Sequence, residues 1–185
     1  MEEIIDILDE NGIKTGQTAT RYEIHRQGFW HKVTAIIVLD TENRILLQQR
    51  STGKMTNPGK WDIAAAGHVD AGEDSFTTII RETHEEIGLK INESASAQDF
   101  HFVLCYRTEK CFTLHGEDLI DRQFQDCYIL RNQNIDPTKL KLQASEVQAA
   151  KLYTLAEFKQ MIANGELINR QPFYDAVIDL LEKES

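Results

Sequence analysis

The chain of 185 residues carries 20 lysines and arginines against 30 aspartates and glutamates, which gives a formal net charge of −10 at pH 7. With 41% hydrophobic and 27% charged residues, the composition is that of an ordinary globular protein and excludes wholesale disorder, collagen and coiled coil. The acidic balance argues against binding to duplex nucleic acid, which needs clustered lysine and arginine, and a polyanionic ligand would need a bound cation.

The N-terminus carries no pattern of export or membrane insertion. The start MEEIIDILDE lacks a basic stretch followed by an apolar one, and the longest apolar run, residues 35–39, is too short to span a bilayer. We therefore expect a cytoplasmic protein without a membrane partner. Cys105, Cys111 and Cys127 show no CxxC spacing and alternate with apolar residues, so we expect three buried free thiols.

The first part of the chain predicts two hairpins and a short strand. An alternating acidic and apolar segment, a turn at residues 10–12 and a second segment predict an N-terminal edge hairpin, whose open edge offers a surface for a homodimer. An apolar run and an alternating run around a turn predict a central hairpin, followed by a loop at residues 51–60. The strands expected here are residues 3–9, 13–21, 33–39, 44–49 and 61–66.

The second part predicts three helices and four more strands. Asp74 or Ser75 caps a helix that Gly88 ends, and Thr154 with Glu157 forms a capping box at the start of the next helix. The helices expected are residues 75–87, 154–163 and 172–181, and the strands are residues 97–106, 110–115, 123–130 and 147–153. This order predicts one α/β domain over residues 1–185, with a mixed sheet and helices on both sides.

Three carboxylates crowd one face of the first long helix. Glu82, Glu85 and Glu86 stand at positions i, i+3 and i+4, where their mutual repulsion destabilises the helix unless a cation binds. An isolated cluster of this kind is most often a solvated acidic face, but apolar residues occupy the neighbouring positions here. Oxygen ligands at this density suit Mg²⁺ or Mn²⁺.

The wider pattern begins at Gly67, continues after five residues with Glu73, and after seven more with the run Arg-Glu-Thr-His-Glu-Glu-Ile-Gly-Leu from Arg81. It resembles the Nudix box, GX5EX7REUXEEXGU, at every fixed position, and departs from the family preference only at Thr83, where a bulky apolar residue is usual. The resemblance implies an α/β/α sandwich around a mixed β-sheet, with residues 67–89 as the Nudix box and residues 1–30 as an N-terminal hairpin extension.

This resemblance also implies an activity, the hydrolysis of the pyrophosphate bond in a diphosphate linked to another moiety. The cofactor implied is Mg²⁺ or Mn²⁺, and the partner is a small-molecule diphosphate. Arg81 resembles the family residue that orients Glu82 and pairs with Glu73 to tie the loop to the helix. The implied metal ligands are Glu82, Glu85, Glu86 and Gly67, with Gly72 and Gly88 as structural support. The general base stays open between Glu82, Glu86 and Glu146.

Residues 28–68 resemble the isopentenyl diphosphate isomerase-like branch of this family. In the isomerases a catalytic cysteine precedes the Gly-His that opens the box, and this chain has Ala66 there. Gln123 and Gln125 stand where the isomerases use a glutamate pair, and a neutral amide cannot act as a base. We therefore expect a hydrolase, with an isomerase or a non-catalytic diphosphate sensor as alternatives.

Six further residues are candidates for contacts around the substrate. His25, His31 and His68 fall near the positions of metal-ligating histidines in the isomerases, which leaves a second metal site open. Without the companion glutamates we expect hydrogen-bonding roles instead and, for His68, a phosphate contact. Three cations precede the box and either steer a phosphorylated substrate or remain ordinary solvated side chains. These cations are Arg50, Lys54 and Lys60.

Overall fold

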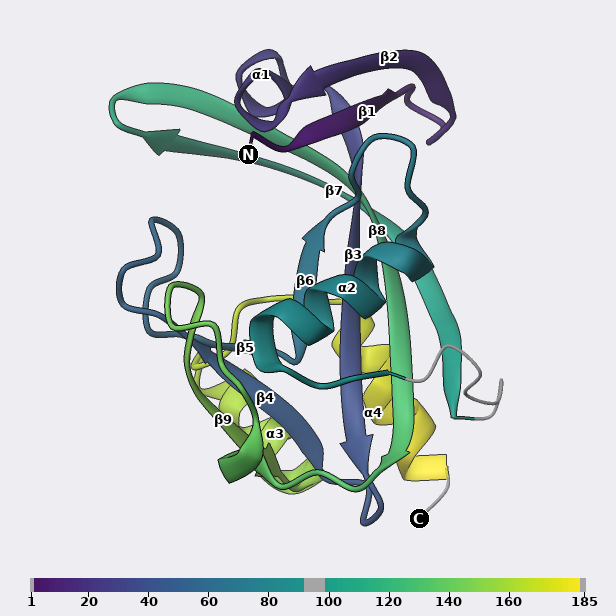
Figure 1. Cartoon of the computed structure of the whole chain (residues 1–185), viewed down its shortest axis with the longest axis vertical. Helices are drawn as coiled ribbons and strands as arrows, with labels where there is room; N and C mark the ends of the chain where they lie inside the picture. The colour runs from purple at the N-terminus through teal and green to yellow at the C-terminus, as the bar shows by residue number, and fades with distance from the viewer. Residues whose placement is uncertain (1, 92–98, 184–185) are drawn as a thin grey trace.

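The computed structural model describes residues 2–91 and 99–183 and has an α/β/α arrangement around a mixed sheet (Figure 1). Its strands are β1 (Ile4–Leu8), β2 (Lys14–Thr20), β3 (Trp30–Asp40), β4 (Ile45–Arg50), β5 (Trp61–Ile63), β6 (Ala65–His68), β7 (Phe100–Leu114), β8 (Glu117–Gln133) and β9 (Val147–Tyr153). Its helices are α1 (Arg21–Gln27), α2 (Ser75–Ile87), α3 (Leu155–Ala163) and α4 (Phe173–Lys183), with a 3₁₀ turn at Pro137–Lys139.

Strand β3 lies at the centre of the sheet and is buried on both faces. It runs parallel to β8 and antiparallel to β1, β4 and β6. Because successive side chains alternate between faces, Ile37 packs with Phe158 and Phe173 of α3 and α4, while Ile36 packs with Ile79 of α2. Each such buried side chain contributes about 1.5–3 kcal/mol, so the alternation in one strand holds both helical layers (Figure 1).

The segment at residues 61–68 forms two strands, and the prediction of a single strand at residues 61–66 is wrong. β5 pairs with β4, where Ile63 lies opposite Leu47, whereas β6 pairs with β3, where Ala66 lies opposite Ala35. Strands β3 and β4 pair with each other only next to their connecting turn. The segment fills the space where they separate and changes partner at Ala64.

Strands β7 and β8 form one long hairpin, so the separate strands predicted at residues 97–106 and 110–115 are also wrong. The polar stretch from Arg107 to Glu109 interrupts the apolar alternation but stays in the ladder, and Arg122 on β8 pairs with Glu109 at 3.1 Å. The connecting turn places His115 and Gly116 at φ 52° and 82°. Residues 97 and 98 of the predicted strand lie outside the described residues.

Helix α1 was not predicted. The N-terminal hairpin itself is confirmed, but its second strand ends at Thr20, which caps α1 in a capping box with Glu23. Gly28 ends the helix at φ 66°, and a Cβ there would lie 3.1 Å from Ile120 of β8. The Thr-x-x-Glu pattern was the sequence signal for this helix. Packing against β8 places α1 beside the hairpin end in Figure 1.

The longer helices begin and end close to the predicted residues. Asp74 caps α2 by accepting a hydrogen bond from the Thr77 amide at 2.8 Å, and Gly88 ends it at φ 71°. Thr154 caps α3 with the expected capping box. None of the described helices is long and apolar enough to cross a membrane.

The cysteines follow the prediction only in part. All three are free thiols, but Cys105 and Cys111 are exposed and only Cys127 is buried. Cys105 and Cys111 lie on the long β7 strand, much of which faces solvent, whereas Cys127 lies on the stretch of β8 that pairs with β3. The strand-like alternation was therefore correct, but the hairpin extends beyond the covered sheet.

Candidate functional site

A cavity of about 920 Å³ opens between the α2 helix and the ends of the two hairpins. Its walls come from Glu3, α1, β3, the loop at residues 51–60, β6, α2, the β7 and β8 hairpin and residues 168–170. Most of the sequence-predicted site residues line it. These are Arg50, Lys54, Gly67, His68, Arg81, Glu82, Glu85, Glu86 and Glu146.

Glu82 packs directly against the backbone of Gly67. A Cβ built at position 67 would lie 2.6 Å from Glu82 Cδ and 2.8 Å from Glu82 Oε1, so only glycine fits between strand β6 and the helix. Burial raises the pKa of Glu82 to about 7, although Arg81 opposes the rise. The carboxyl group is therefore held close to the strand in a site that disfavours its charged form.

Arg81 connects the carboxylates at this end of the cavity. Its guanidinium lies 2.8 Å from Glu82, 3.4 Å from Glu85, 3.3 Å from Glu73 and 3.3 Å from Asp70. Five donors on a planar group suit this role, because each N–H can hold a different oxygen. The sequence had identified Glu73 and Glu82 as partners of Arg81 but not Asp70.

Glu86 is the most buried of the three box glutamates. It is 9% exposed and accepts a hydrogen bond from Gln48 Nε2 at 2.6 Å. Burial raises its pKa to about 8, and the nearby carboxylates of Glu82 and Glu146 add to this effect while Gln48 opposes it. In the metal-free protein a proton therefore takes the place of a cation at this carboxylate near neutral pH.

These donors fit a hard divalent cation. The group offers only carboxylate oxygens, with the Gly67 backbone close to Glu82, and oxygen ligands are those that Mg²⁺ prefers. A cation there would also neutralise the repulsion that raises the pKa of Glu86. Glu85 is about half exposed, so its side chain is free to turn toward a ligand.

The predicted cations lie in different places. Lys54 forms an ion pair with Glu146 inside the cavity, and Arg50 donates to the Thr56 carbonyl at 3.1 Å in its own loop. Lys60 lies outside the lining, where its ammonium donates to the Gly165 carbonyl at 3.3 Å. The structure therefore brings Arg50 and Lys54 to the site and leaves Lys60 away from it.

Gly72 and Gly88 shape the two ends of the box. Gly72 has φ 84° in the loop before α2, and its amide donates to Asp6 Oδ2 at 3.1 Å. A Cβ at Gly88 would lie 2.7 Å from Lys141 Cβ, so the chain after η1 packs tightly on the end of α2. A side chain is strained at both positions, because φ is positive.

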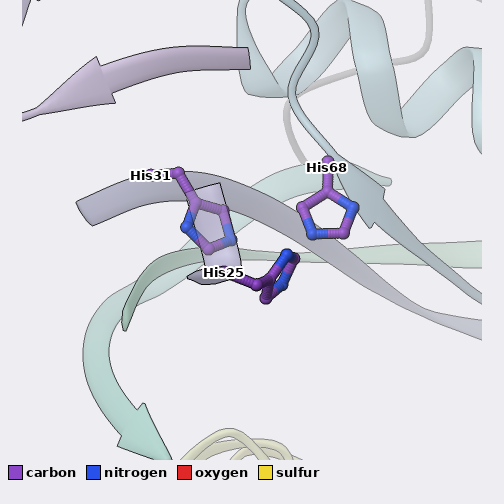
Figure 2. A group of neighbouring side chains, drawn as sticks. All are labelled: His25, His31 and His68. Atoms are coloured by element: carbon purple, nitrogen blue, oxygen red, sulfur yellow. The ribbon is translucent and has the colours of Figure 1, made fainter. Parts of the chain in front are cut away.

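Three histidines meet at the other end of the cavity (Figure 2). His25 comes from α1, His31 from β3 and His68 from β6, and one ring nitrogen of each lies within 4.8 Å of the others. Burial lowers the pKa of His31 to about 4 and lowers that of His68 as well. The lowered pKa values favour the uncharged forms of His31 and His68, whose rings can offer lone pairs to a ligand.

An oxygen atom lies close to the Nδ1 atom of each ring. His25 Nδ1 lies 2.7 Å from the Arg21 carbonyl, His31 Nδ1 lies 3.2 Å from the Phe29 carbonyl, and His68 Nδ1 lies 3.2 Å from Glu3 Oε2. The Nε2 atoms of His31 and His68 are buried and have no hydrogen-bond partner among the described residues. Metal-ligating histidines commonly show this arrangement, in which the second nitrogen is fixed by an oxygen.

Asp121 of β8 completes this group. Its Oδ1 lies 3.5 Å from His25 Nε2 and 3.6 Å from His31 Nε2. Burial opposes its ionisation, but the neighbouring histidine rings outweigh that effect and lower the pKa of Asp121. The hydrogen-bonding roles expected for the histidines do not account for the unpartnered Nε2 atoms, whereas three imidazoles and a carboxylate suit Zn²⁺ or Mn²⁺.

Four residues of the two groups were missed by the sequence reading. Asp70 comes from the loop before α2, Gln48 from β4, Glu3 from the residue before β1 and Asp121 from β8. Asp121 lies two residues before Gln123, where the sequence placed the isomerase glutamate pair, so a search of neighbouring acidic residues would have found it. Nothing local marks the other three, because the fold alone brings them to the cavity.

The raised pKa values predict how the metal-free protein responds to pH. Glu86 binds its proton more tightly in the folded chain than in the unfolded one, so this contribution to stability is complete below about pH 4.5 and is lost as the pH rises through about 8. We expect the melting temperature in EDTA to fall between about pH 6.5 and pH 8, above the range in which the lowered pKa of His31 acts in the opposite direction. Glu86→Gln should reduce that slope, and Glu82, with a pKa of about 7, accounts for the remainder. Glu85→Gln changes an exposed carboxylate of the same helix and should leave the slope of melting temperature against pH unchanged. Equal slopes in wild type and Glu86→Gln would contradict the prediction.

The histidine group predicts a cation site that differs from the glutamate site. Titration with Co²⁺ should give the d–d absorption of a nitrogen-ligated ion, and His31→Asn should abolish it because one imidazole of three is lost. Glu85→Gln is the matched control, since it alters the glutamate site and should leave the absorption unchanged. A spectrum lost in Glu85→Gln and kept in His31→Asn would assign the ion to the glutamates instead.

Comparisons with known proteins agree with this architecture. The isopentenyl-diphosphate Delta-isomerase of Streptomyces avermitilis is 37% identical over 95 residues, which are 51% of this chain and 48% of that protein. Nudix hydrolase 3 of Arabidopsis thaliana is 35% identical over 167 residues, which are 89% of this chain and 21% of that protein. The chain thus spans about a fifth to a half of the length of these two relatives.

Other matches extend over whole chains. The uncharacterised Nudix hydrolase lmo0368 of Listeria monocytogenes is 30% identical over 163 residues, covering 88% of this chain and 86% of that protein. The crystal structure of DR0079 from Deinococcus radiodurans superposes with a TM-score of 0.67 at 17% identity, over 95% of this chain and 97% of that one. The NUDIX domain model matches residues 30–175, and the chain belongs to this family.

Proposed function

We propose that this protein hydrolyses the pyrophosphate bond of a small molecule in which a diphosphate is linked to another group, with Mg²⁺ or Mn²⁺ as cofactor. One observation carries the proposal: Glu82, Glu85 and Glu86 lie together on the wall of a cavity large enough for such a molecule, and Glu82 packs against the Gly67 backbone. Nudix enzymes bind small diphosphates and typically use divalent metals. The moiety attached to the diphosphate is not determined by the family.

The chemistry needs the negative charge of the diphosphate to be reduced before water can attack phosphorus. A divalent cation on the box glutamates supplies that, since it neutralises phosphate oxygens and lowers the pKa of a water molecule. Arg81 holds Glu82 and Glu85 in place from one side, and Gln48 holds Glu86 from the other. These contacts fix the positions of the carboxylates and cost no rearrangement when the substrate binds.

Three carboxylates can accept the proton of the attacking water. Glu82 and Glu86 belong to the box, and Glu146 also lines the cavity, with Lys54 as its ion-pair partner. Burial favours the protonated forms of Glu82 and Glu86 until a cation binds. All three stay candidates for the general base.

Removing a box glutamate should abolish most turnover without unfolding the chain. We expect Glu85→Gln and Glu86→Gln each to lower turnover of a diphosphate panel at least about 100-fold, since direct ligands matter at least as much as their supporting residues. At neutral pH the metal-free melting temperature should stay about equal in Glu86→Gln, because that carboxyl is already protonated, and should stay equal or rise in Glu85→Gln, because a repelling charge is gone. Release of phosphate or monophosphate with Mg²⁺ is the measurement, and full activity in both variants would contradict the metal site.

The isomerase alternative is less well supported, because its catalytic thiol has no counterpart here. Ala66 cannot move a proton, and the amides of Gln123 and Gln125 cannot act as bases. We expect isopentenyl diphosphate with Mg²⁺ or Mn²⁺ in D₂O to gain no deuterium in its carbon skeleton. NMR of the recovered compound tests this, and deuterium on carbon would favour the isomerase; hydrolysis of the compound remains allowed.

The same panel of diphosphates distinguishes a hydrolase from the second alternative, a non-catalytic sensor. A non-catalytic diphosphate sensor would bind one of the compounds tightly and hydrolyse none of them in the presence of Mg²⁺. The complete set of box glutamates favours hydrolysis over binding alone.

A further inference from the structure

Strand β7 has one open edge. The strand extends over 15 residues and pairs with β8 on one side, and no other strand pairs with it in the part of the chain that the structure describes. The end of the hairpin also extends away from α3 and α4 in Figure 1. An open edge of this length is a template for another strand, and natural proteins usually cover or interrupt such edges.

The open edge of β2 is less suited to strand pairing. β2 has only seven residues, and Gly16 within it has φ 82°, so the backbone leaves the extended conformation there. No residue within Phe100–Leu114 has a positive φ, and the register of β7 with β8 shifts only between Phe102 and Leu104. The part of β7 after Leu104 is therefore a regular strand with a free edge.

Symmetry restricts how two copies of β7 can pair. In an antiparallel pair, residues whose N–H and C=O groups face the other strand alternate with residues whose groups point away. Two identical strands related by a two-fold axis follow the same alternation, so the axis passes beside a residue and never between two residues. That residue lies opposite its own copy, and the residues directly before and after it lie opposite each other.

The charges on β7 select the residue at the axis. With the axis at Thr108, Arg107 lies opposite the partner's Glu109, and symmetry produces this ion pair twice. An axis at Arg107 or at Lys110 would place two cations opposite each other, and an axis at Glu109 would place two carboxylates opposite each other. Like charges directly opposite on paired strands are destabilising, so charge complementarity favours the register centred on Thr108.

The same register pairs the neighbouring side chains well. Tyr106 lies opposite the partner's Lys110, which suits a contact between an ammonium group and an aromatic ring. Leu104 lies opposite the partner's Phe112, so two apolar side chains meet. The register that pairs the charges therefore pairs apolar and aromatic residues as well.

The two charged side chains are ordered before a partner binds. The Arg107 guanidinium lies 4.2 Å from the centre of the Trp30 ring, and Glu109 forms its ion pair with Arg122 on the neighbouring strand. The Glu109 side chain is still 47% exposed, and a carboxylate has lone pairs for a second guanidinium. Pairing therefore immobilises few additional rotamers, which lowers the entropic cost of the interface.

We propose that the open edge of β7 binds the β7 strand of a second copy of this chain, in antiparallel pairing about a two-fold axis at Thr108. The two sheets then continue into each other. Lys110 and Phe112 line the cavity, so the partner's Tyr106 and the partner's Leu104 lie beside that wall. The inference does not rest on the proposed function, because the pairing needs neither a metal nor a diphosphate.

A charge at position 108 tests the axis, because it meets its own copy. We expect a dimer of the wild type in sedimentation velocity, and Thr108→Glu and Thr108→Lys should each weaken it at least about tenfold through repulsion of like charges. An equimolar mixture of the two variants should associate again as a heterodimer, which native mass spectrometry identifies by its mass. Association in the mixture also verifies that both variants fold.

Thr18→Glu and Thr18→Lys are the matched controls. Thr18 is an exposed residue of β2, the strand with the other open edge. Both variants should dimerise like the wild type. A dimer that is lost in both Thr18 variants and kept in both Thr108 variants would place the interface at the N-terminal hairpin and overturn the proposal.

Oxidation tests the register independently. Cys105 lies opposite the partner's Cys111, and opposite residues of an antiparallel pair have Cα atoms about 4.5–5.5 Å apart, within reach of a disulfide. Within one chain the two cysteines lie roughly 20 Å apart along β7 and cannot be bridged. Diamide accepts two electrons and two protons from a pair of thiols, so it should link Cys105 to the partner's Cys111 and leave the buried Cys127 reduced.

Peptide mass mapping identifies the linked cysteines. Three results would overturn the proposal: a wild type that stays monomeric across the concentration series, no association in the mixture of the Thr108 variants, or disulfides that join two copies of the same cysteine in place of Cys105 and Cys111. The last of these would show that the strands pair in another register.

Discussion

The absence of a side chain at position 67 allows the close approach on which the site depends. A methyl group there would overlap Glu82, so any other residue would separate strand β6 from helix α2. Because the helix lies this close, its acidic face is turned into the protein and loses water. The raised pKa values of Glu82 and Glu86 follow from that loss.

Successive residues of strand β6 point to opposite faces of the sheet, so the strand contributes to both ends of the cavity. Gly67 faces α2, and the next residue, His68, points to the opposite face and joins His25 and His31. Two sets of ligands with different chemistry, carboxylates on one side and imidazoles on the other, are thus fixed by adjacent residues. A shift of this strand by one residue would disrupt both sets at once.

Much of the fold and of the glutamate site could be predicted because the signals are local. The box spacing, the caps of α2 and α3 and the alternation in β3 and β4 each lie within one segment of the chain. The partner change at Ala64 could not be predicted, since it depends on where β3 and β4 separate. The same holds for Glu3 and Gln48, which the fold alone brings to the site.

The N-terminal segment lies before residue 30, where the family match begins, yet it contributes Glu3, Arg21 and His25 to the cavity. The box helix and this part of the cavity wall are therefore encoded in separate stretches of the chain. A mutation in the first stretch can alter that part of the wall and leave the box glutamates unchanged.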